Sequence, residues 1–262
     1  MNSCIKVMSF NMRTAVLADG ANSFWERKPR ILAMLERERP DIIGFQEVTD
    51  EMREWLGEAL ADYTVVGCGR EKHYDGESVA IALRRGAFEL LSLRHFWLSH
   101  TPSVPGSRYG GDQSSCPRIT AVAELYCKRE HRVLTVLNTH LDHKGRDARY
   151  LGMLDNARAV LATDAPFVFM GDMNALPDSP ELLLAKELLA TRGGRCISEG
   201  VGATFHGFKG AAGARHEIDY IFTDLSAAPT RLVPDEGKDG LYYSDHFALT
   251  AELTFSDDGL ND

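Results

Sequence analysis

The sequence predicts an α/β fold in which two β-sheets form the interior and helices lie outside them. Its 262 residues are enough for one large α/β domain with a sizeable core. The N-terminal part alternates short β-branched runs with helical patterns, whereas the middle carries strand candidates with few helices between them. No linker, repeat or low-complexity segment divides the chain. We therefore expect a single domain over residues 1–255, followed by a flexible acidic tail at 256–262.

The N-terminal part begins with two strands that flank a helix. The first strand is expected at residues 5–10 and the second at 41–45. Between them, apolar residues recur on one helical face of residues 25–39, and Pro40 ends this helix. A second helix follows its N-cap Thr49 and runs to residue 60.

The middle of the chain contains a series of strand candidates, which favours antiparallel pairing. They are residues 63–66, 78–84, 88–93, 120–127 and 133–138. After them we expect helices at 145–162 and 179–191 and strands at 167–170, 217–222 and 246–255. The segment 99–118 is rich in Ser, Pro and Gly and is long for a structureless connection, so it is predicted to be a functional loop.

The composition restricts the function classes. The chain carries 29 Lys and Arg against 38 Asp and Glu, a formal net charge of −9. Nucleic-acid binders usually draw their affinity from a basic surface, so this charge argues against them without excluding a local basic cleft. The hydrophobic share of 44% and the charged share of 26% are ordinary for a globular protein and do not suggest a disordered, collagen-like or membrane chain.

The cysteines and the N-terminus bear on the compartment. The number of cysteines, five, is odd, and none forms a C-x-x-C pair, so we expect no disulfide framework and a reducing compartment. The start MNSCIKVMSFN lacks the apolar core of a signal peptide, and no apolar run approaches the ~20 residues of a membrane span. We therefore expect a cytoplasmic protein, and by default a monomer.

Polar residues recur where the predicted strands end, which is where α/β scaffolds hold functional groups rigidly. These motifs are Phe10-Asn11, Gln46-Glu47, Asn138-Thr139-His140, Gly171-Asp172-Met173-Asn174, Ile218-Asp219-Tyr220 and Ser244-Asp245-His246.

The carboxylates in these motifs suggest a metal-assisted reaction. Glu47, Asp172, Asp219 and Asp245 offer hard oxygen ligands suited to Mg²⁺, which uses one or two protein carboxylates together with water and substrate phosphate. Such an ion would neutralise charge that develops on phosphorus and would activate or orient water. The set therefore predicts a divalent-metal-dependent hydrolase that cleaves a phosphate ester with water.

The neutral polar residues and histidines fit the same chemistry. Asn11 and Asn174 can donate to phosphate oxygens or orient a nucleophile, and His140 and His246 can donate protons near neutral pH. Asp219 could hold His246 in its productive tautomer and raise its pKa. Taken singly, each of these residues is as well explained by turns, caps or packing, and only the combination favours a site.

Four further residues are open between substrate contact and ordinary surface positions. They are Tyr109, His143, Lys144 and His206.

The ordered set FN, QE, NTHLDH, GDMN, IDYIF and SDH, between residue 5 and about residue 255, resembles the endonuclease/exonuclease/phosphatase superfamily, which includes DNase I-like nucleases. The resemblance implies a four-layer α/β sandwich, with two mainly antiparallel sheets packed face to face and helices outside.

The resemblance also implies roles around the metal and the water. Glu47 would be the main ligand of Mg²⁺, or alternatively Mn²⁺, with Asn11 and Asp245 close to the ion. Asp172 would orient or deprotonate the attacking water.

Further implied roles concern the phosphate group. Asn174 would hold it and His140 would contact it, with Asn11 as an additional contact. Asp219 would pair with His246. Arg118, in the run CPRIT, fits the phosphate-contacting arginine of the family.

One departure from the family bears on the substrate. Abasic-site endonucleases carry an acidic residue two positions after the first Asn, and here that position is Arg13, which argues against the DNA-repair branch. The FNMR start, the run GDMNALPDSP and TFHGF before IDYIF resemble short bacterial members related to the deadenylase-like branch. Substrates in that group range from RNA to phosphorylated sugars.

Three functions follow as hypotheses. The acidic charge and compact length favour a phosphatase or phosphodiesterase for a small molecule such as a sugar phosphate, and a pocket closed by segments 99–118 and 204–215 would support it. The alternative is a 3′–5′ exoribonuclease, which a basic rim along the cleft would support. A binding module without catalysis is the third, although Glu47, Asp172 and His246 are all present.

Overall fold

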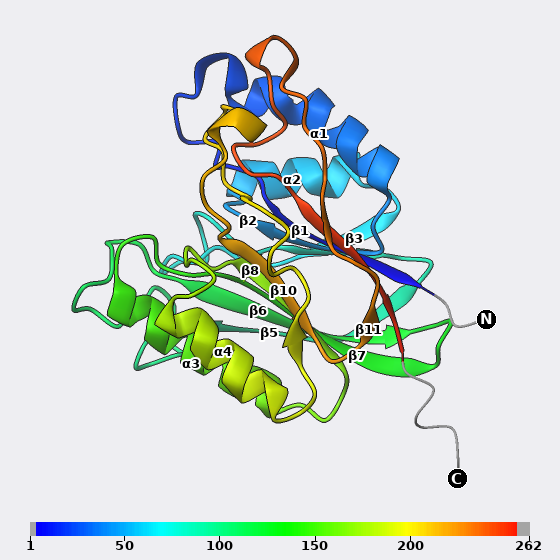
Figure 1. Ribbon diagram of the computed structural model, residues 1–262, viewed down its shortest axis with the longest axis vertical. Helices are drawn as coiled ribbons and strands as arrows, with labels where there is room; N and C mark the ends of the chain where they lie inside the picture. The colour runs from blue at the N-terminus through cyan, green and yellow to red at the C-terminus, as the bar shows by residue number, and fades with distance from the viewer. Residues whose placement is uncertain (1–3, 256–262) are drawn as a thin grey trace.

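The structure is a computed structural model that describes residues 4–255. Residues 1–3 and 256–262, which include the expected acidic tail, lie outside the described part. Two β-sheets pack face to face, with α1 and α2 over one sheet and α3 and α4 over the other (Figure 1). The four-layer sandwich predicted from the sequence is confirmed.

The first sheet contains the first and the last strands of the described chain. Its members are β1 (Ile5–Asn11), β2 (Ile42–Gln46), β3 (Tyr63–Val66), β4 (Ile81–Arg84), β11 (Ser226–Ala227), β12 (Arg231–Leu232) and β13 (Leu249–Thr254). The strand order is β11-β13-β1-β2-β4-β3, and β12 pairs with β13. β1 and β2 are parallel, and the other neighbours are antiparallel.

The second sheet is formed by the middle of the chain. Its members are β5 (Phe88–Trp97), β6 (Ile119–Cys127), β7 (Arg132–His140), β8 (Phe167–Asp172), β9 (Arg195–Cys196) and β10 (Asp219–Thr223). The order is β5-β6-β7-β8-β10-β9, in which β7 and β8 are parallel and the other neighbours antiparallel. β5 extends four residues beyond the strand predicted at 88–93, because residues 94–97 continue the pairing with β6.

The four α-helices lie within one or two residues of their predicted bounds. They are α1 (Phe24–Glu38), α2 (Asp50–Ala59), α3 (Arg146–Leu161) and α4 (Pro180–Ala190). α1 ends with Arg39 in the left-handed conformation directly before Pro40. Thr49 is the N-cap residue of α2, as predicted, but its hydroxyl makes no capping hydrogen bond. Among residues 4–255, no helix has the length and apolar character needed to cross a bilayer.

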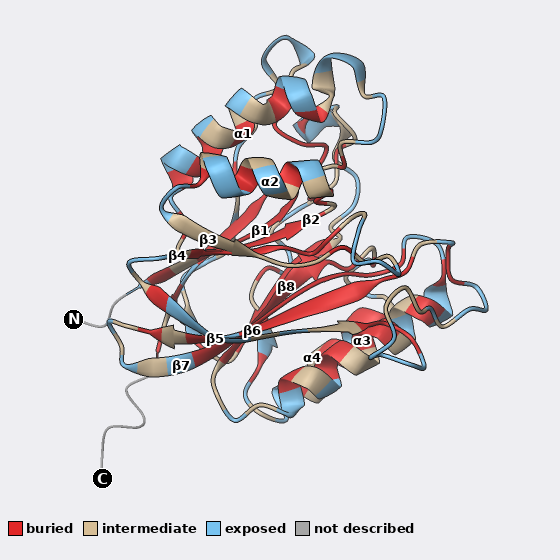
Figure 2. Cartoon of the chain, turned by 180° about the vertical axis from the view of Figure 1, so that it is seen from behind, coloured by how far each residue is buried: buried red, intermediate tan, exposed pale blue. Residues whose placement is uncertain are grey.

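Three buried apolar clusters hold the four layers together. The first lies between the sheets and includes Val7, Ile81 and Val136. The second lies between the first sheet and α1–α2, and the third between the second sheet and α3–α4. Figure 2 shows the consequence, since strands of both sheets are buried while each helix buries one face and exposes the other. Each large apolar side chain buried in this way contributes roughly 1.5–3 kcal/mol.

A buried polar contact joins the two sheets where they come closest. A Cβ on Gly44 of β2 would lie 2.8 Å from the Met170 sulfur and 3.0 Å from the Asn138 side chain of β7, so a larger residue there would push these side chains aside. The Asn138 amide donates to the carbonyls of Phe45 (2.8 Å) and Ala80 (2.9 Å), and its oxygen accepts from Gln46 Nε2 (2.7 Å). These bonds fix the position of one sheet relative to the other beside the strand ends.

Candidate active site

The strand-end motifs meet at one edge of the sandwich. The parallel strands β1 and β2 end at Asn11 and Gln46, which are partners in the register, and Glu47 follows directly. The parallel strands β7 and β8 end at His140 and Asp172, which are also partners. Because parallel strands end on the same side, each sheet presents its polar groups at this edge.

Two antiparallel strands bring further residues to the same place. Asp219 is the first residue of β10 and lies opposite Asp172 in the register. His246 precedes β13 and forms an isolated bridge with Phe205. Directly before Asp172, Gly171 has a φ of +152°, and a Cβ there would lie 2.0 Å from the Thr139 carbonyl oxygen. A glycine is therefore required for the sheet to deliver the Asp172 carboxylate.

These residues surround one pocket of about 630 Å³. Seven of the nine site residues predicted from the sequence line it, namely Glu47, Arg118, His140, Asp172, Asn174, Asp245 and His246. The other two lie behind the wall and bond to lining residues. Asn11 contacts Glu47 and Asp172, and Asp219 contacts His246.

Asp219 and His246 form a buried pair that links the sheets. His246 Nδ1 lies 2.9 Å from Asp219 Oδ2, and both side chains are almost fully buried. Burial alone would lower the pKa of His246, but the charge and hydrogen bond of Asp219, with the charges of Asp245 and Asp172, raise it to about 10. The ring is therefore an imidazolium near neutral pH, with Nε2 3.9 Å from Asp172 Oδ2.

Asn11 connects the carboxylates of Glu47 and Asp172. Its Nδ2 donates to Glu47 Oε1 (3.0 Å) and to Asp172 Oδ2 (2.9 Å). Burial and the charge of Asp219 raise the pKa of Asp172 to about 7, although the His246 charge opposes them. Such a carboxylate can accept a proton near neutral pH.

The pKa of Glu47 is shifted in the opposite direction from that of Asp172. Burial would raise its pKa, but the hydrogen bond from Asn11, the charge of His246 and the Thr14 backbone N–H keep the pKa below its usual value. Glu47 is therefore an anion, as a ligand for a hard cation must be.

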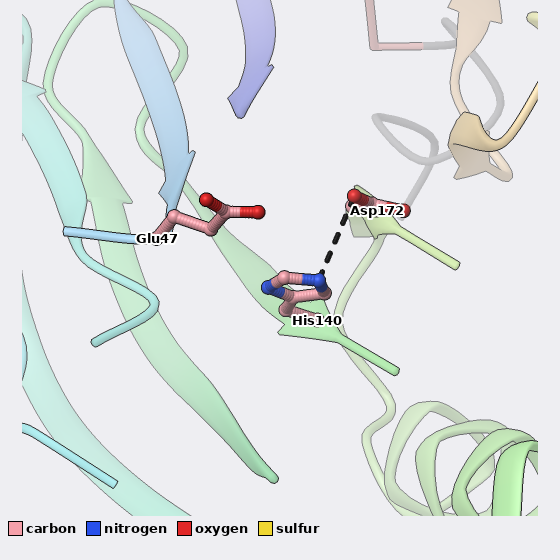
Figure 3. Close-up of side chains that lie close together, drawn as sticks. All are labelled: Glu47, His140 and Asp172. Carbon is pink, nitrogen blue, oxygen red and sulfur yellow. Dashed lines mark ion pairs between the residues drawn. The ribbon is translucent and has the colours of Figure 1, made fainter. Parts of the chain in front are cut away.

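Glu47, His140 and Asp172 form a cluster whose ligand atoms lie within 4.8 Å of one another. Figure 3 shows the His140 ring between the two carboxylates, with its Nε2 3.6 Å from Asp172 Oδ2. Burial, followed by the charges of Arg118 and Arg70, keeps the pKa of His140 well below 6.5, so the ring is neutral. Carboxylate oxygens beside a neutral imidazole could hold a divalent ion.

The other predicted metal residues flank this cluster. Asp245 lines the same pocket, and its Oδ2 lies 3.5 Å from Arg13 Nη1. Asn11 turns its N–H groups to the carboxylates, and its Oδ1 accepts from the Arg13 N–H at 2.9 Å. The donor set thus fits a hard divalent cation, and Glu47 is an anionic group of this set that lines the pocket.

The phosphate-binding candidates lie on the side of the second sheet. Asn174 Nδ2 lies 3.0 Å from His140 Nε2 and donates to the Leu141 carbonyl at 3.1 Å. Arg118, almost fully buried, donates through Nη2 to His143 Nδ1 at 2.8 Å. These groups form a cluster of hydrogen-bond donors beside the carboxylates.

Three residues at the site have left-handed backbone, which is unusual for residues other than glycine. They are Arg13 (φ 55°), Glu47 (φ 61°) and Asn174 (φ 47°). Such conformations cost on the order of 1–3 kcal/mol each and cluster where function requires a particular side-chain direction.

The four residues that the sequence left open differ in where they lie relative to the pocket. His143 lines the pocket and contacts Arg118, whereas Lys144 does not line it. Tyr109 belongs to another pocket, where its hydroxyl bonds to Asp155. His206 is buried, with its ring against Phe247 and Tyr242.

The pocket also contains residues that were not predicted. Arg70, from the loop between β3 and β4, and Arg13 add positive charge, and the Phe205 ring lies 5.0 Å from the His246 ring. The only hint for Arg70 was its place in a glycine-rich loop. The two segments expected to close the pocket contribute little to its lining, namely Cys116 and Arg118 from one and Phe205 from the other.

The chain belongs to the endonuclease/exonuclease/phosphatase family, whose model matches residues 8–246. Members of this family are phosphoester hydrolases that generally depend on a divalent metal. The resemblance predicted from the six strand-end motifs is thereby confirmed.

Solved structures and a curated relative extend this result. A mannosyl-6-phosphatase from Bacteroides thetaiotaomicron is 26% identical, covers 96% of this chain and 100% of that chain, and has a TM-score of 0.85. The human Nocturnin catalytic domain with bound sulfate is 19% identical over 98% of this chain and 96% of that chain, with a TM-score of 0.72, which concerns the fold alone. An uncharacterised protein of Acanthamoeba polyphaga mimivirus is 29% identical over 125 residues, so the match spans 45% of this chain and about half (46%) of that relative.

Proposed function

We propose that the protein hydrolyses a phosphoester of a small molecule, such as a sugar phosphate, in a reaction that depends on Mg²⁺ or Mn²⁺. One observation carries this proposal. A carboxylate with a pKa near 7, Asp172, shares the Asn11 amide with the anionic Glu47 and faces the same pocket as the imidazolium of His246. A base, a cation ligand and an acid thus line one pocket.

The divalent ion would be held by Glu47, with Asp245 and Asn11 beside it, and would supply charge neutralisation at the phosphate. Asp172 would take the proton of the attacking water. The carboxylate also accepts hydrogen bonds from Asn11 Nδ2 and from the Asn174 backbone N–H, both at 2.9 Å, and these hold it in one orientation while it does so.

The remaining residues would hold the phosphate and the leaving group. Asn174, His140 and Arg118 supply donors, and the neutral His140 would contribute a hydrogen bond rather than a charge. His246, kept protonated by Asp219, would stabilise charge that develops on the phosphate oxygens or on the leaving oxygen.

A small substrate is favoured by the pocket and by the relatives. Apolar residues Leu17, Leu176 and Phe205 line one part of the pocket, and the chain has a net charge of −9. The similar structure from Bacteroides thetaiotaomicron, which covers 96% of this chain, is that of a mannosyl-6-phosphatase. Both points support a phosphorylated molecule of sugar size.

The second candidate is a 3′–5′ exoribonuclease. The basic residues Arg13, Arg70, Arg118 and His143 along the pocket favour it, because they could follow a backbone of phosphates. Binding without catalysis remains a weaker hypothesis. The cytoplasmic location and the monomeric state remain predictions from the sequence.

A hydrolysis screen with Mg²⁺ tests the proposal. Purified protein is incubated with a panel of sugar phosphates, with bis-p-nitrophenyl phosphate and with a short labelled RNA, and Asp172→Ala serves as the blank. Phosphate release from a sugar phosphate with the RNA intact supports the proposal. Stepwise shortening of the RNA replaces it with the exonuclease, and no turnover of any phosphoester overturns both.

A further inference from the structure

One end of the pocket contains two arginines that emerge from different elements. Arg118 directly precedes β6 and is 3% exposed, and Arg70 lies in the loop between β3 and β4 with 11% of its side chain exposed. Both line the pocket together with Glu47 and His140. Both residues therefore lie beside two members of the cluster of Figure 3, Glu47 and His140.

Several buried N–H groups of these arginines have no hydrogen-bond partner within residues 4–255. They are Arg118 Nε, Arg118 Nη1 and Arg70 Nε. Arg118 Nε forms an ion pair with Asp142 Oδ2 at 3.5 Å, and Arg70 Nε forms one with Glu71 Oε1 at 3.9 Å, but neither contact is a hydrogen bond. Since buried donors are nearly always paired, these groups require an acceptor from a ligand or from water.

The other contacts of the two arginines hold them in place. Arg70 Nη1 lies 2.7 Å from Glu77 Oε2, and Arg118 Nη2 donates to His143 at 2.8 Å. Each guanidinium is thus held by one of its nitrogens, while its other buried N–H groups lack a hydrogen-bond acceptor in the described part of the chain. A planar fork of this kind suits an oxyanion.

A small recess lies between the arginines and the carboxylate cluster. Its volume is about 10 Å³, and its lining includes Arg70, Arg118 and His140 together with the carboxylates Glu47 and Glu77, all of which also line the main pocket. This is close to the minimum space for one water molecule. The recess is therefore about the size of a single oxygen atom.

We propose that Arg70 acts with Arg118 as a specificity-determining pair that binds the third terminal oxygen of a phosphomonoester. A monoester presents three terminal oxygens and a charge of about −1.5 to −2 at pH 7. A diester has only two terminal oxygens and a single negative charge, so it would leave more of these N–H groups without an acceptor. The pair therefore favours monoesters. This inference rests on the proposed hydrolase function.

The test compares Arg70→Gln/Glu77→Gln with Glu77→Gln alone, so that no variant leaves a buried carboxylate without its arginine. The matched control is Arg192→Gln/Asp224→Asn, because that ion pair spans 2.9 Å with side chains 18% and 16% exposed and its residues do not line the pocket. The readouts are kcat/KM for p-nitrophenyl phosphate and for bis-p-nitrophenyl phosphate, the inhibition constant of inorganic phosphate, and the melting temperature.

Loss of charge-assisted hydrogen bonds predicts a fall of roughly 10- to 100-fold in kcat/KM for the monoester, a similar rise in the inhibition constant of phosphate, and less than about a threefold change for the diester. The control pair should alter the melting temperature but neither constant. An unchanged inhibition constant, or equal losses on both esters, overturns the role of Arg70. Wild-type protein that hydrolyses neither ester would instead overturn the proposed function.

Discussion

The two sheets supply different chemistry to the same pocket. The first sheet contributes Glu47, directly after β2, and Asp245, in the segment before β13, which suit a cation, whereas β7 and β8 of the second sheet end in His140 and Asp172, which suit water and phosphate. Neither sheet holds a complete set. The hydrogen bonds Asn11–Asp172 and His246–Asp219 cross from one sheet to the other. The comparison teaches that the proposed reaction depends on how the sheets pack as much as on the residues themselves.

The largest effect is expected from removing the cation that we propose beside the first sheet. Excess EDTA should abolish turnover, because Glu47 would then repel the substrate phosphate instead of binding it through an ion, and Mg²⁺ or Mn²⁺ should restore it. Glu47→Gln should raise the Mg²⁺ concentration needed for half-maximal activity by about tenfold or more. Turnover that is unaffected by chelation would show that the first sheet has another role.

Removing the proposed base of the second sheet should come next. Asp172→Ala should lower kcat by roughly 10²–10⁴-fold, as expected for loss of a general base. The fold should remain, because burial raises the pKa of Asp172 to about 7. A raised carboxyl pKa makes the folded state less stable as the pH rises from about 4 to 7, so the variant should not melt earlier at pH 8. Melting curves and steady-state kinetics test both points, and full activity would contradict the mechanism.

The cross-sheet pair gives a prediction about pH. If protonated His246 is required, activity should fall as the pH rises through its pKa of about 10. Asp219→Asn removes the main group that raises this pKa, so the alkaline limb of the kcat/KM profile should move to lower pH. His246→Ala should remove that limb altogether, with roughly 10²–10⁴-fold lower activity. An alkaline limb that stays in place in Asp219→Asn would separate His246 from the chemistry.

The smallest effect on activity is expected from the contact that joins the sheets away from the pocket. Asn138→Ala removes three buried hydrogen bonds and should lower the free energy of unfolding by about 2–4 kcal/mol, with a loss of activity of about tenfold or less. Asn156→Ala is the control, since Asn156 is also fully buried but bonds to Thr120 and Gly152 on its own side. Equal losses of activity in both variants would mean that sheet packing does not tune the site.

Much of the fold and most of the site could be predicted because local signals coincide there. β-Branched runs followed by Asn, Glu, His or Asp mark strand ends, and parallel neighbours such as β7 and β8 end at the same edge. The two-residue strands β9, β11 and β12 were not predicted, because so short a segment has no periodicity. Their pairing is decided by the neighbouring strand.

Some residues whose roles were not predicted lie on loops. Others belong to strand-end motifs but have side chains that do not face the pocket. Arg70 and Phe205 reach the pocket only through the tertiary course of their loops. Gln46 and Asn138 belong to strand-end motifs, yet their side chains face the space between the sheets and bond to each other. Which face a strand residue occupies depends on how the second sheet packs, and that information is not local.

The path of the chain through the two sheets has a consequence for how activity can be lost. The chain leaves the first sheet after β4, builds the second sheet, and returns at β11, so the residues of the pocket come from both ends and the middle of the sequence. A fragment that keeps only one sheet would retain only part of the site residues and would lose the bonds Asn11–Asp172 and His246–Asp219 that cross between the sheets. A partly unfolded state should therefore have no residual activity. In a denaturant titration, the loss of turnover should coincide with the separation of the sheets, and catalysis becomes a direct reporter of the intact fold.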